Sequence, residues 1–363
     1  MKVSEIIRHL ESIAPPSYQE SYDNSGLLIG RAEAEVSSIL ISLDVTEEVV
    51  AEAVERNCQL IIAHHPIIFG GLKSLTGKNY VERTVMQAIK KDVAIYAIHT
   101  NLDNIHSGVN HRIGEVLGIG HRKILQPKKD TLCKLAVFTP SESVDTVMNA
   151  MFKAGAGHIG NYSECSFLSE GRGSFKGDES AEPYVGNKGE RHYEKEARIE
   201  VIVPRHLESK VIREMIAAHP YEEVAYDIYK LENVNTNLGA GMIGYLEEPM
   251  YALDFLSQVK EKMGGVVRYT ALVKDEVQKI AWCGGSGSFL LGAARKAGAD
   301  VFLTSDFKYH QFFDAENDVI IADIGHYENE QFTKQLVASI IKEKFVNFAV
   351  LLAETNTNPI NYL

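Results

Sequence analysis

Apolar runs alternate with amphipathic segments along the first third of the chain. The runs are short and almost continuously apolar, as in QLIIAHHP at 59–66, whereas segments such as EEVVAEAVERN at 47–57 repeat apolar residues at helical spacing. Strands that are apolar at nearly every position are typical of a parallel sheet that is buried on both faces. The pattern therefore predicts a β-α-β-α-β-α order in an α/β fold, with strands at 37–46, 59–66 and 93–103.

The last third of the chain repeats this order. Its predicted strands are KIAWCGGSGS at 279–288, ADVFLTSD at 299–306, VIIADIGHYE at 319–328 and NFAVLLAE at 347–354. In both thirds the third strand leads into a His, three residues and then an acid, as in His99…Asp103 and His326…Glu330. We interpret this as a weak internal repeat, which predicts two similar α/β halves.

The middle of the chain has a different pattern. A strand at 133–140, a helix and a strand are followed by a polar, glycine-rich stretch at about 169–195, and then by a second strand-helix-strand run. Two βαβ runs over some 100 residues predict a ferredoxin-like α+β domain. We expect it to be inserted at 126–234 into one split α/β domain formed by 1–125 and 235–363. The basic segment HRKILQPKKD at 121–130 is interpreted as a linker.

Composition narrows the class of protein. The 363 residues are 45% hydrophobic and carry a net charge of −12, which disfavours a nucleic-acid partner because binding to phosphate backbones depends on clustered Lys and Arg. No apolar run reaches the roughly 18–20 residues of a membrane helix, and the N-terminus lacks a signal-peptide core. The four cysteines are scattered, without a CxxC pair. We expect a cytoplasmic protein with no membrane partner.

Two adjacent histidines, His64 and His65, lie in the apolar run IIAHHPIIF. Neighbouring side chains of a strand point to opposite faces, so both can serve one site only if the strand ends there. Pro66 favours such an end, because it has no N–H for a sheet ladder. Ligands of open parallel sheets gather at the carboxyl ends of strands. Such ends would bring together four histidines and two carboxylates: His64, His65, His99, Asp103, His326 and Glu330.

This set of side chains predicts a metal site. Neutral imidazole and carboxylate suit divalent Zn, Mn, Fe, Co and Ni. Adjacent histidines could face two ions, with one carboxylate bridging them. The alternative is that each histidine is a packed or capped residue, which is the usual role of a single His at a strand end. That alternative is weakest for the His64–His65 pair, because burying two rings without partners costs about 1–3 kcal/mol each.

Three further segments carry alternatives that the sequence leaves open. Gly285 and Ser286, in CGGSGS, form either a tight turn or a loop whose amides face a substrate anion. Asp306 and His310 either line the pocket or cap a helix. Asp23 and Asn24 either form a turn or contact substrate.

The chain resembles the family of GTP cyclohydrolase I type 2 homologues, also called NGG-one-interacting-factor-three-like proteins. The resemblance covers about 1–120 and 238–363, and the central segment is similar to the PII- and CutA-like inserts of the longer bacterial members, through FKGDESAEPYVG and AHPYEEVAYDIY. The motifs that carry it in the split domain are YDNSGLLIG, AHHPIIF, IHTNLD, CGGSGS, TSDFKYH, DIGHYENE and ETNTNPINY.

The resemblance implies a dinuclear site with five ligands: His64, His65, Asp103, His326 and Glu330. It implies that Glu330 contacts both ions, with His65 and Asp103 on one and His64 and His326 on the other. His99 would support the site from outside the coordination sphere or act as an acid and base. Family members resemble toroidal homohexamers, built as trimers of dimers, with the metal sites facing an inner cavity.

Metal-assisted hydrolysis is the function that the resemblance implies, with a nucleotide-like small molecule as substrate. The family name points to carbon 8 of the GTP purine, and phosphoesters and cyclic amides are further options. His99 or His310 would move the proton, and Gly285 and Ser286 would hold phosphate. The alternative is a metal-binding regulator or scaffold whose PII-like insert senses a small molecule or a partner.

Overall fold

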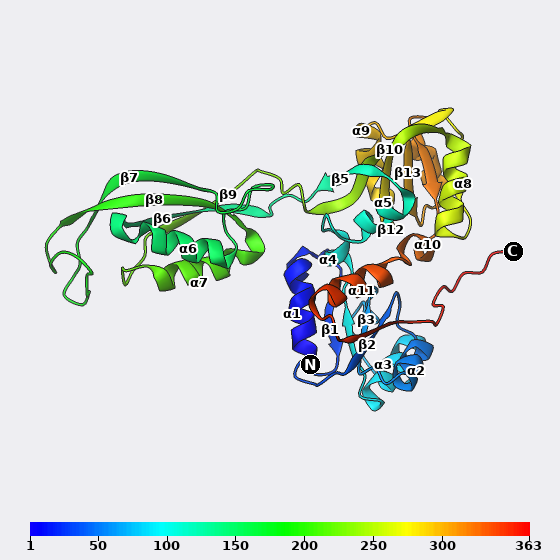
Figure 1. Ribbon diagram of the computed structural model, residues 1–363, viewed down its shortest axis with the longest axis horizontal. Coiled ribbons are helices and arrows are strands. Elements are labelled where there is room, and N and C mark those ends of the chain that lie inside the picture. The colour runs from blue at the N-terminus through cyan, green and yellow to red at the C-terminus, as the bar shows by residue number, and fades with distance from the viewer. The chain divides into compact units, whose positions relative to one another are not determined.

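The computed structural model describes residues 1–363, which form two compact units (Figure 1). The first unit combines Met1–Pro127 with Asn237–Leu363, and the second is Lys128–Thr236. The boundaries expected from the sequence differ from these by two residues. None of the helices is both long and apolar enough to cross a membrane.

The first unit contains two sheets. The first sheet has the order β1-β4-β3-β2-β15, in which β1 is antiparallel to β4 and the other pairs are parallel. Its strands are β1 (Gly26–Ile29), β2 (Ser38–Ser42), β3 (Leu60–Ala63), β4 (Ala94–Ala97) and β15 (Ala349–Leu352).

Apolar residues on both faces of this sheet explain its continuous apolar runs. Ile39 and Ile41 of β2 pack in a core with helices α1 (Val3–Ile13) and α11 (Thr333–Lys344). Leu40, between them, packs in a second core with α2 (Glu47–Glu55) and α3 (Tyr80–Lys90). Successive side chains of a strand point to opposite faces, so a sheet covered on both sides needs an apolar residue at every position.

The second sheet has the order β11-β14-β13-β12-β10-β5, and only β12, β13 and β14 are parallel to one another. Helices α5 (Val109–Leu117) and α8 (Ala252–Met263) pack in one core with it, and α9 (Leu291–Lys296) packs in another. Its strands are β5 (Gly120–Pro127), β10 (Gly239–Tyr251), β11 (Arg268–Tyr269), β12 (Glu276–Ser286), β13 (Val301–Ser305) and β14 (Ile320–Asp323).

Two expectations about strands are wrong in detail. The basic segment 121–130 is not a linker, because most of it is β5, which pairs with β10. The final strand, β15, does not extend the C-terminal sheet, because it lies parallel to β2 in the first sheet. A strand from the last third of the chain thus completes the sheet formed by the first third.

The second unit has the element order β6-α6-β7-β8-α7-β9 and the sheet order β7-β8-β6-β9, with all neighbours antiparallel. Both helices pack in one core with the sheet. The polar stretch at 169–195 is partly regular, because β7 pairs with β8 as far as Phe175 and His192. The bounds are β6 (Leu132–Pro140), α6 (Val144–Ala154), β7 (Ser166–Phe175), β8 (His192–Pro204), α7 (Glu208–Ala218) and β9 (Tyr226–Lys230).

Short helices complete the fold, and two of them bear on the site. Helix α4 (Thr100–Asp103) follows β4, and α10 (His326–Glu330) follows β14. The remaining single turns are η1 (Pro16–Tyr18), η2 (Ser141–Ser143), η3 (Arg205–Leu207), η4 (Ser288–Leu290) and η5 (Tyr309–Ala315).

Candidate metal centre

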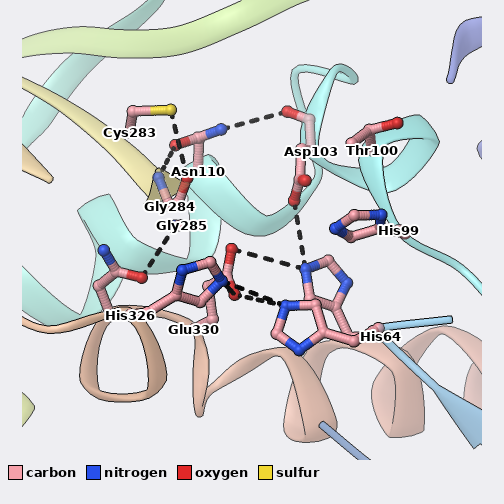
Figure 2. A network of polar contacts seen from close by, with 12 residues as sticks. His64, His99, Thr100, Asp103, Asn110, Cys283, Gly284, Gly285, His326 and Glu330 are labelled. Carbon is pink, nitrogen blue, oxygen red and sulfur yellow. Dashed lines mark hydrogen bonds and ion pairs between the residues drawn. The ribbon is translucent and has the colours of Figure 1, made fainter. Parts of the chain in front are cut away.

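The six residues selected from strand ends lie together in the first unit. His64 and His65 follow β3 directly, and their amides still donate to Ser42 and Leu43. The others lie at the first and last positions of two short helices: His99 precedes α4 and Asp103 ends it, whereas His326 begins α10 and Glu330 ends it. Figure 2 shows the side chains of His64, Asp103, His326 and Glu330 converging on one point.

In all four histidines the same ring nitrogen, Nδ1, faces a hydrogen-bond acceptor. Each has its Nδ1 within hydrogen-bond distance of an oxygen that can only accept, so Nδ1 carries the hydrogen of the neutral ring and Nε2 is free to bind a metal. The acceptors are the Ile98 carbonyl for His64 (2.8 Å), Asp44 for His65 (2.7 Å), Asp23 for His99 (2.7 Å) and Asp306 for His326 (2.6 Å).

Glu330 lies at the middle of the cluster, with 2% of its side chain exposed. Its Oε2 is 3.0 Å from His65 Nε2 and 3.1 Å from His326 Nε2. Its Oε1 is 3.7 Å from His64 Nε2. One carboxylate thus presents a different oxygen to each side of the cluster, as a bridging ligand does.

His64 Nε2 and Asp103 Oδ1 are 3.6 Å apart, which is too far for a hydrogen bond. Both atoms are buried without a hydrogen-bond partner. Leaving buried polar atoms unpaired costs about 1–3 kcal/mol each. A cation between them would satisfy both, so the residues present fit a metal ion.

The side chains form groups that could each hold a metal ion. His64, Asp103 and Glu330 make one, His65, His326 and Glu330 make a second, and His64, His65 and His99 make a third. This grouping contradicts the pairing that the resemblance implied, because Asp103 lies with His64 and His326 lies with His65. The sharing of Glu330 between two groups agrees with the expectation for that residue.

Carboxylates control protonation in the second group. Burial by itself would lower the pKa of His65, but hydrogen bonds to Asp44 and Glu330 raise it to about 9. Burial acts in the same direction on His326, and the charge of Glu330 with the hydrogen bond to Asp306 raises its pKa to about 11. Burial would raise the pKa of Glu330, yet the neighbouring histidines hold it well below its usual range. The group therefore favours positive charge at its centre.

Asp103 differs from Glu330. Burial raises the pKa of its carboxyl to about 6, and the charge of Glu330 adds to that rise, against the opposing effect of His64. Two carboxylates close together with little water resist ionising together, so a divalent cation between them is favoured.

The side chains of Asp23 and Asn24 are held by hydrogen bonds within the protein. The Asp23 side chain is 0% exposed and accepts from His99, from the amide and hydroxyl of Thr100, and from Ser25. Burial would raise the pKa of Asp23, but the hydrogen bond and charge of His99 hold it far below its usual range. Asn24 donates to the Ile68 carbonyl at 2.5 Å and so fixes the segment after His65.

Gly285 lies against Glu330 and His326 of the cluster. Its φ is +62°, and a Cβ there would be 2.5 Å from Glu330 Oε1. The amides of Gly284 and Gly285 donate to the side chains of Asn110 and Asn329, so these two groups are already occupied and do not support the predicted anion loop. Ser286 ends β12, with its side chain exposed.

His310 lies apart from these contacts. It is exposed in η5, and its ring contacts Tyr309 and Phe313. Asp306, in contrast, is a direct partner of His326. The structure thus places Asp306 in contact with the cluster and gives His310 no contact with it.

Several residues of the site were missed by sequence reasoning. Asp44 orients His65, and the rings of Tyr22 and Phe69 lie beside the cluster, with Phe69 6.1 Å from His99 and 6.3 Å from Tyr22 between ring centroids. Asp44 follows β2, so the strand-end rule that selected His64 could have selected it. Tyr22 and Phe69 are more than half exposed, and this exposure can be recognised only in the folded structure.

Comparison with known proteins gives consistent matches. The family model described as Duf34/NIF3 (NGG1p interacting factor 3) matches residues 1–359. The chain is 40% identical to the "GTP cyclohydrolase 1 type 2 homolog" of Bacillus subtilis over 367 residues, which cover 99% of this chain and 98% of the relative. The protein of the same name from Halalkalibacterium halodurans is 39% identical, with the same coverage. The crystal structure of a Bacillus cereus protein related to NIF3 superposes with a TM-score of 0.87 at 38% identity and covers 100% of this chain and 99% of that one.

Proposed function

This chain belongs to the Duf34/NIF3 family, and we propose from that premise that it is a dinuclear metal-dependent hydrolase acting on a nucleotide-like substrate. His64, Asp103 and Glu330 would hold one divalent ion, and His65, His326 and Glu330 the other. Zn, Fe, Mn, Co and Ni all suit this set of nitrogen and oxygen donors.

One observation carries the proposal: Glu330 presents its two oxygens to two different sets of histidines inside the protein. A structural zinc site usually has four protein ligands, whereas each of these groups supplies three, which leaves room for water or substrate. When bound, a pair of divalent ions generates a strong nucleophile from water at neutral pH and stabilises charge that develops on the substrate.

His99 is the residue of this chain best placed to move a proton. Asp23 holds its Nδ1, and its ring centroid is 5.2 Å from that of His64 and 5.3 Å from that of His65. A histidine fixed at one nitrogen by a buried carboxylate can exchange a proton at the other nitrogen. We therefore assign His99 the role of general acid and base beside the ions.

The nucleotide-like substrate rests on the names of the relatives and on two exposed rings. The relatives are named for GTP cyclohydrolase 1 type 2. Phe69 lies next to His99 and Tyr22 lies next to Phe69, and the two rings offer an aromatic surface on which a planar ring could stack. GTP is therefore the first substrate to test, with phosphodiesters and cyclic amides beside it.

The test combines metal content with turnover. We expect about two ions per chain by elemental mass spectrometry, and hydrolysis of at least one screened compound that requires them. Glu330→Gln should lose both ions, whereas His65→Ala and Asp103→Asn should each lose a different one. Full metal content in Glu330→Gln would contradict the site.

A second candidate function is a metal-binding regulator. One observation favours it: residues 128–236 fold as a separate unit that contributes none of the cluster residues. Its strand order and connectivity support the proposal of a ferredoxin-like, PII-type sensor domain. Two bound ions without turnover of any compound in the screen would favour this function over the hydrolase.

A further inference from the structure

The chain after β15 runs as an irregular tail, residues 353–363, away from the first sheet (Figure 1). We propose that this tail is a positioning element of the metal centre, in which Thr357 acts through Asp44 on the ligand His65. The inference rests on the proposed metal site and adds to it a residue that is itself no ligand.

The start of the tail is anchored to helix α2. The amides of Glu354 and Thr355 donate to the two carboxylate oxygens of Glu52, at 2.8 and 3.0 Å, and the Thr355 hydroxyl donates to the same side chain at 2.6 Å. Burial would raise the pKa of Glu52, but these hydrogen bonds lower it to about 2. The path of the tail at this point is therefore fixed by charge-assisted hydrogen bonds.

Two residues further on, the tail reaches the support of a metal ligand. The Thr357 hydroxyl donates to Asp44 Oδ2 at 2.6 Å, and Asp44 Oδ1 accepts from His65 Nδ1 at 2.7 Å. His65 Nε2 faces Glu330 Oε2 at 3.0 Å. A continuous series of contacts thus joins the tail to the centre of the cluster.

The Thr357 hydroxyl restrains the carboxylate of Asp44. The Asp44 side chain is 34% exposed, so its carboxylate could rotate towards water. The hydroxyl of Thr357 occupies the oxygen that His65 leaves free, and this fixes the plane of the carboxylate. The hydrogen-bond partners of a ligating histidine set its ring orientation and basicity, and their loss typically weakens metal binding 10–100-fold.

The tail also contacts the segment that carries the other ligands. Asn358 Nδ2 donates to Glu328 Oε1 at 2.8 Å. Glu328 is buried in α10, between His326 and Glu330. Two consecutive tail residues therefore contact Asp44, which orients His65, and the short helix α10 that carries His326 and Glu330. These three residues make up the second group.

The experiment measures Co²⁺ binding to the full-length protein by absorption spectroscopy and equilibrium dialysis, with the metal as the only probe. We expect Thr357→Val to weaken one of two Co²⁺ sites by about tenfold and to change its visible spectrum, with the other site unaltered. Thr357→Ser keeps the hydroxyl and should restore wild-type binding.

Two controls separate this effect from a general loss of structure. Thr355→Val makes the same chemical change two residues earlier, on the hydroxyl that meets Glu52. The amides of Glu354 and Thr355 still hold the tail on Glu52 in this variant, so both Co²⁺ sites should be unchanged. Asp44→Asn should weaken the same site as Thr357→Val, and adding Thr357→Val to it should cause no further loss, because the hydroxyl acts through Asp44.

Three results would overturn the inference: wild-type binding in Thr357→Val, an equal loss in Thr355→Val, or full additivity with Asp44→Asn. If Thr357→Val unfolds, Thr357→Ala, which removes the hydroxyl and adds no bulk, takes its place in the same comparisons. A wild-type protein that binds fewer than two ions would overturn both the proposed function and this inference. If the wild-type protein binds two ions and Thr357→Val binds them equally well, only the inference is overturned.

Discussion

The acceptor at Nδ1 sets the ring orientation of each histidine in the cluster. Three of these acceptors are carboxylates on other segments: Asp44 after β2, Asp23 before β1 and Asp306 after β13. The ligating residue types could be predicted from sequence because an adjacent His pair before a proline is unusual. Asp44 also follows a strand but was not selected, because a single Asp after a strand is common and its partner lies 21 residues away.

Proton release is the first prediction at the scale of residues. The raised pKa values of His65, about 9, and His326, about 11, mean that both rings carry an extra proton at neutral pH in the metal-free protein. A ligating nitrogen must lose that proton, so loading should release at least two protons per chain and affinity should fall as the pH falls. Calorimetry in buffers of different ionisation enthalpy measures this, and release of no protons would contradict it.

The role of Asp23 gives a second prediction. Asp23→Asn removes the charge that orients His99, so kcat should fall by about 10²-fold while metal content stays at the wild-type level. His99→Gln should cause a similar loss, and the double variant should be no worse than either one, because the two residues act as a unit. If the fold-loss of kcat in the double variant equals the product of the two single losses, this coupling is refuted. Thermal unfolding of each variant checks that the fold is retained.

At the scale of elements, apolar periodicity predicted the buried strands but not all of their partners. The pattern marks β2 and β15 as apolar on both faces, yet it carries no information on which sheet β15 joins. In β5 and in the part of the β7–β8 hairpin at 169–195, charged and small residues interrupt the apolar pattern, because most of these side chains are at least partly exposed and need not be apolar.

The turn after β12 provides the prediction at this scale. Gly285→Ala places a Cβ against Glu330 Oε1 and strains a backbone with φ of +62°, so we expect a loss of about 1–2 kcal/mol in unfolding free energy and at least tenfold weaker metal binding. Gly292→Ala, in α9 with nothing within 4 Å of its Cβ, is the matched control. It should keep metal binding and raise stability by about 0.5–1 kcal/mol. Equal behaviour of the two variants would show that proximity to Glu330 is irrelevant.

At the scale of the whole molecule, the repeat of His-x3-acid motifs predicted which strand ends meet. It placed His99, Asp103, His326 and Glu330 together without knowledge of the path between them. The repeat could not supply the grouping of ligands, because whether His64 or His65 faces Asp103 depends on the direction of each side chain after β3. Figure 2 shows that His64 is the one that faces Asp103.

Assembly is the prediction for the whole molecule. From the family resemblance of the sequence, we propose that the protein assembles as a trimer of dimers. Light scattering coupled to gel filtration should give six times the chain mass of 40.3 kDa. A dimer that persists at high protein concentration would refute the ring and leave the metal site unaffected.

The return of β15 to β2 has a consequence for biosynthesis. The open edge of β2 is covered only by residues 349–352, and His65 meets Glu330, the proposed bridging ligand, 265 residues further along the chain. At about 5–20 residues per second, the ribosome needs on the order of 15–60 s to supply them. During that interval the nascent N-terminal sheet has an unpaired edge, and the proposed ion between His65 and Glu330 can be bound only after Glu330 has been synthesised. A prematurely terminated chain would therefore lack its bridging ligand, and could be recognised by chaperones and proteases through its exposed strand edge.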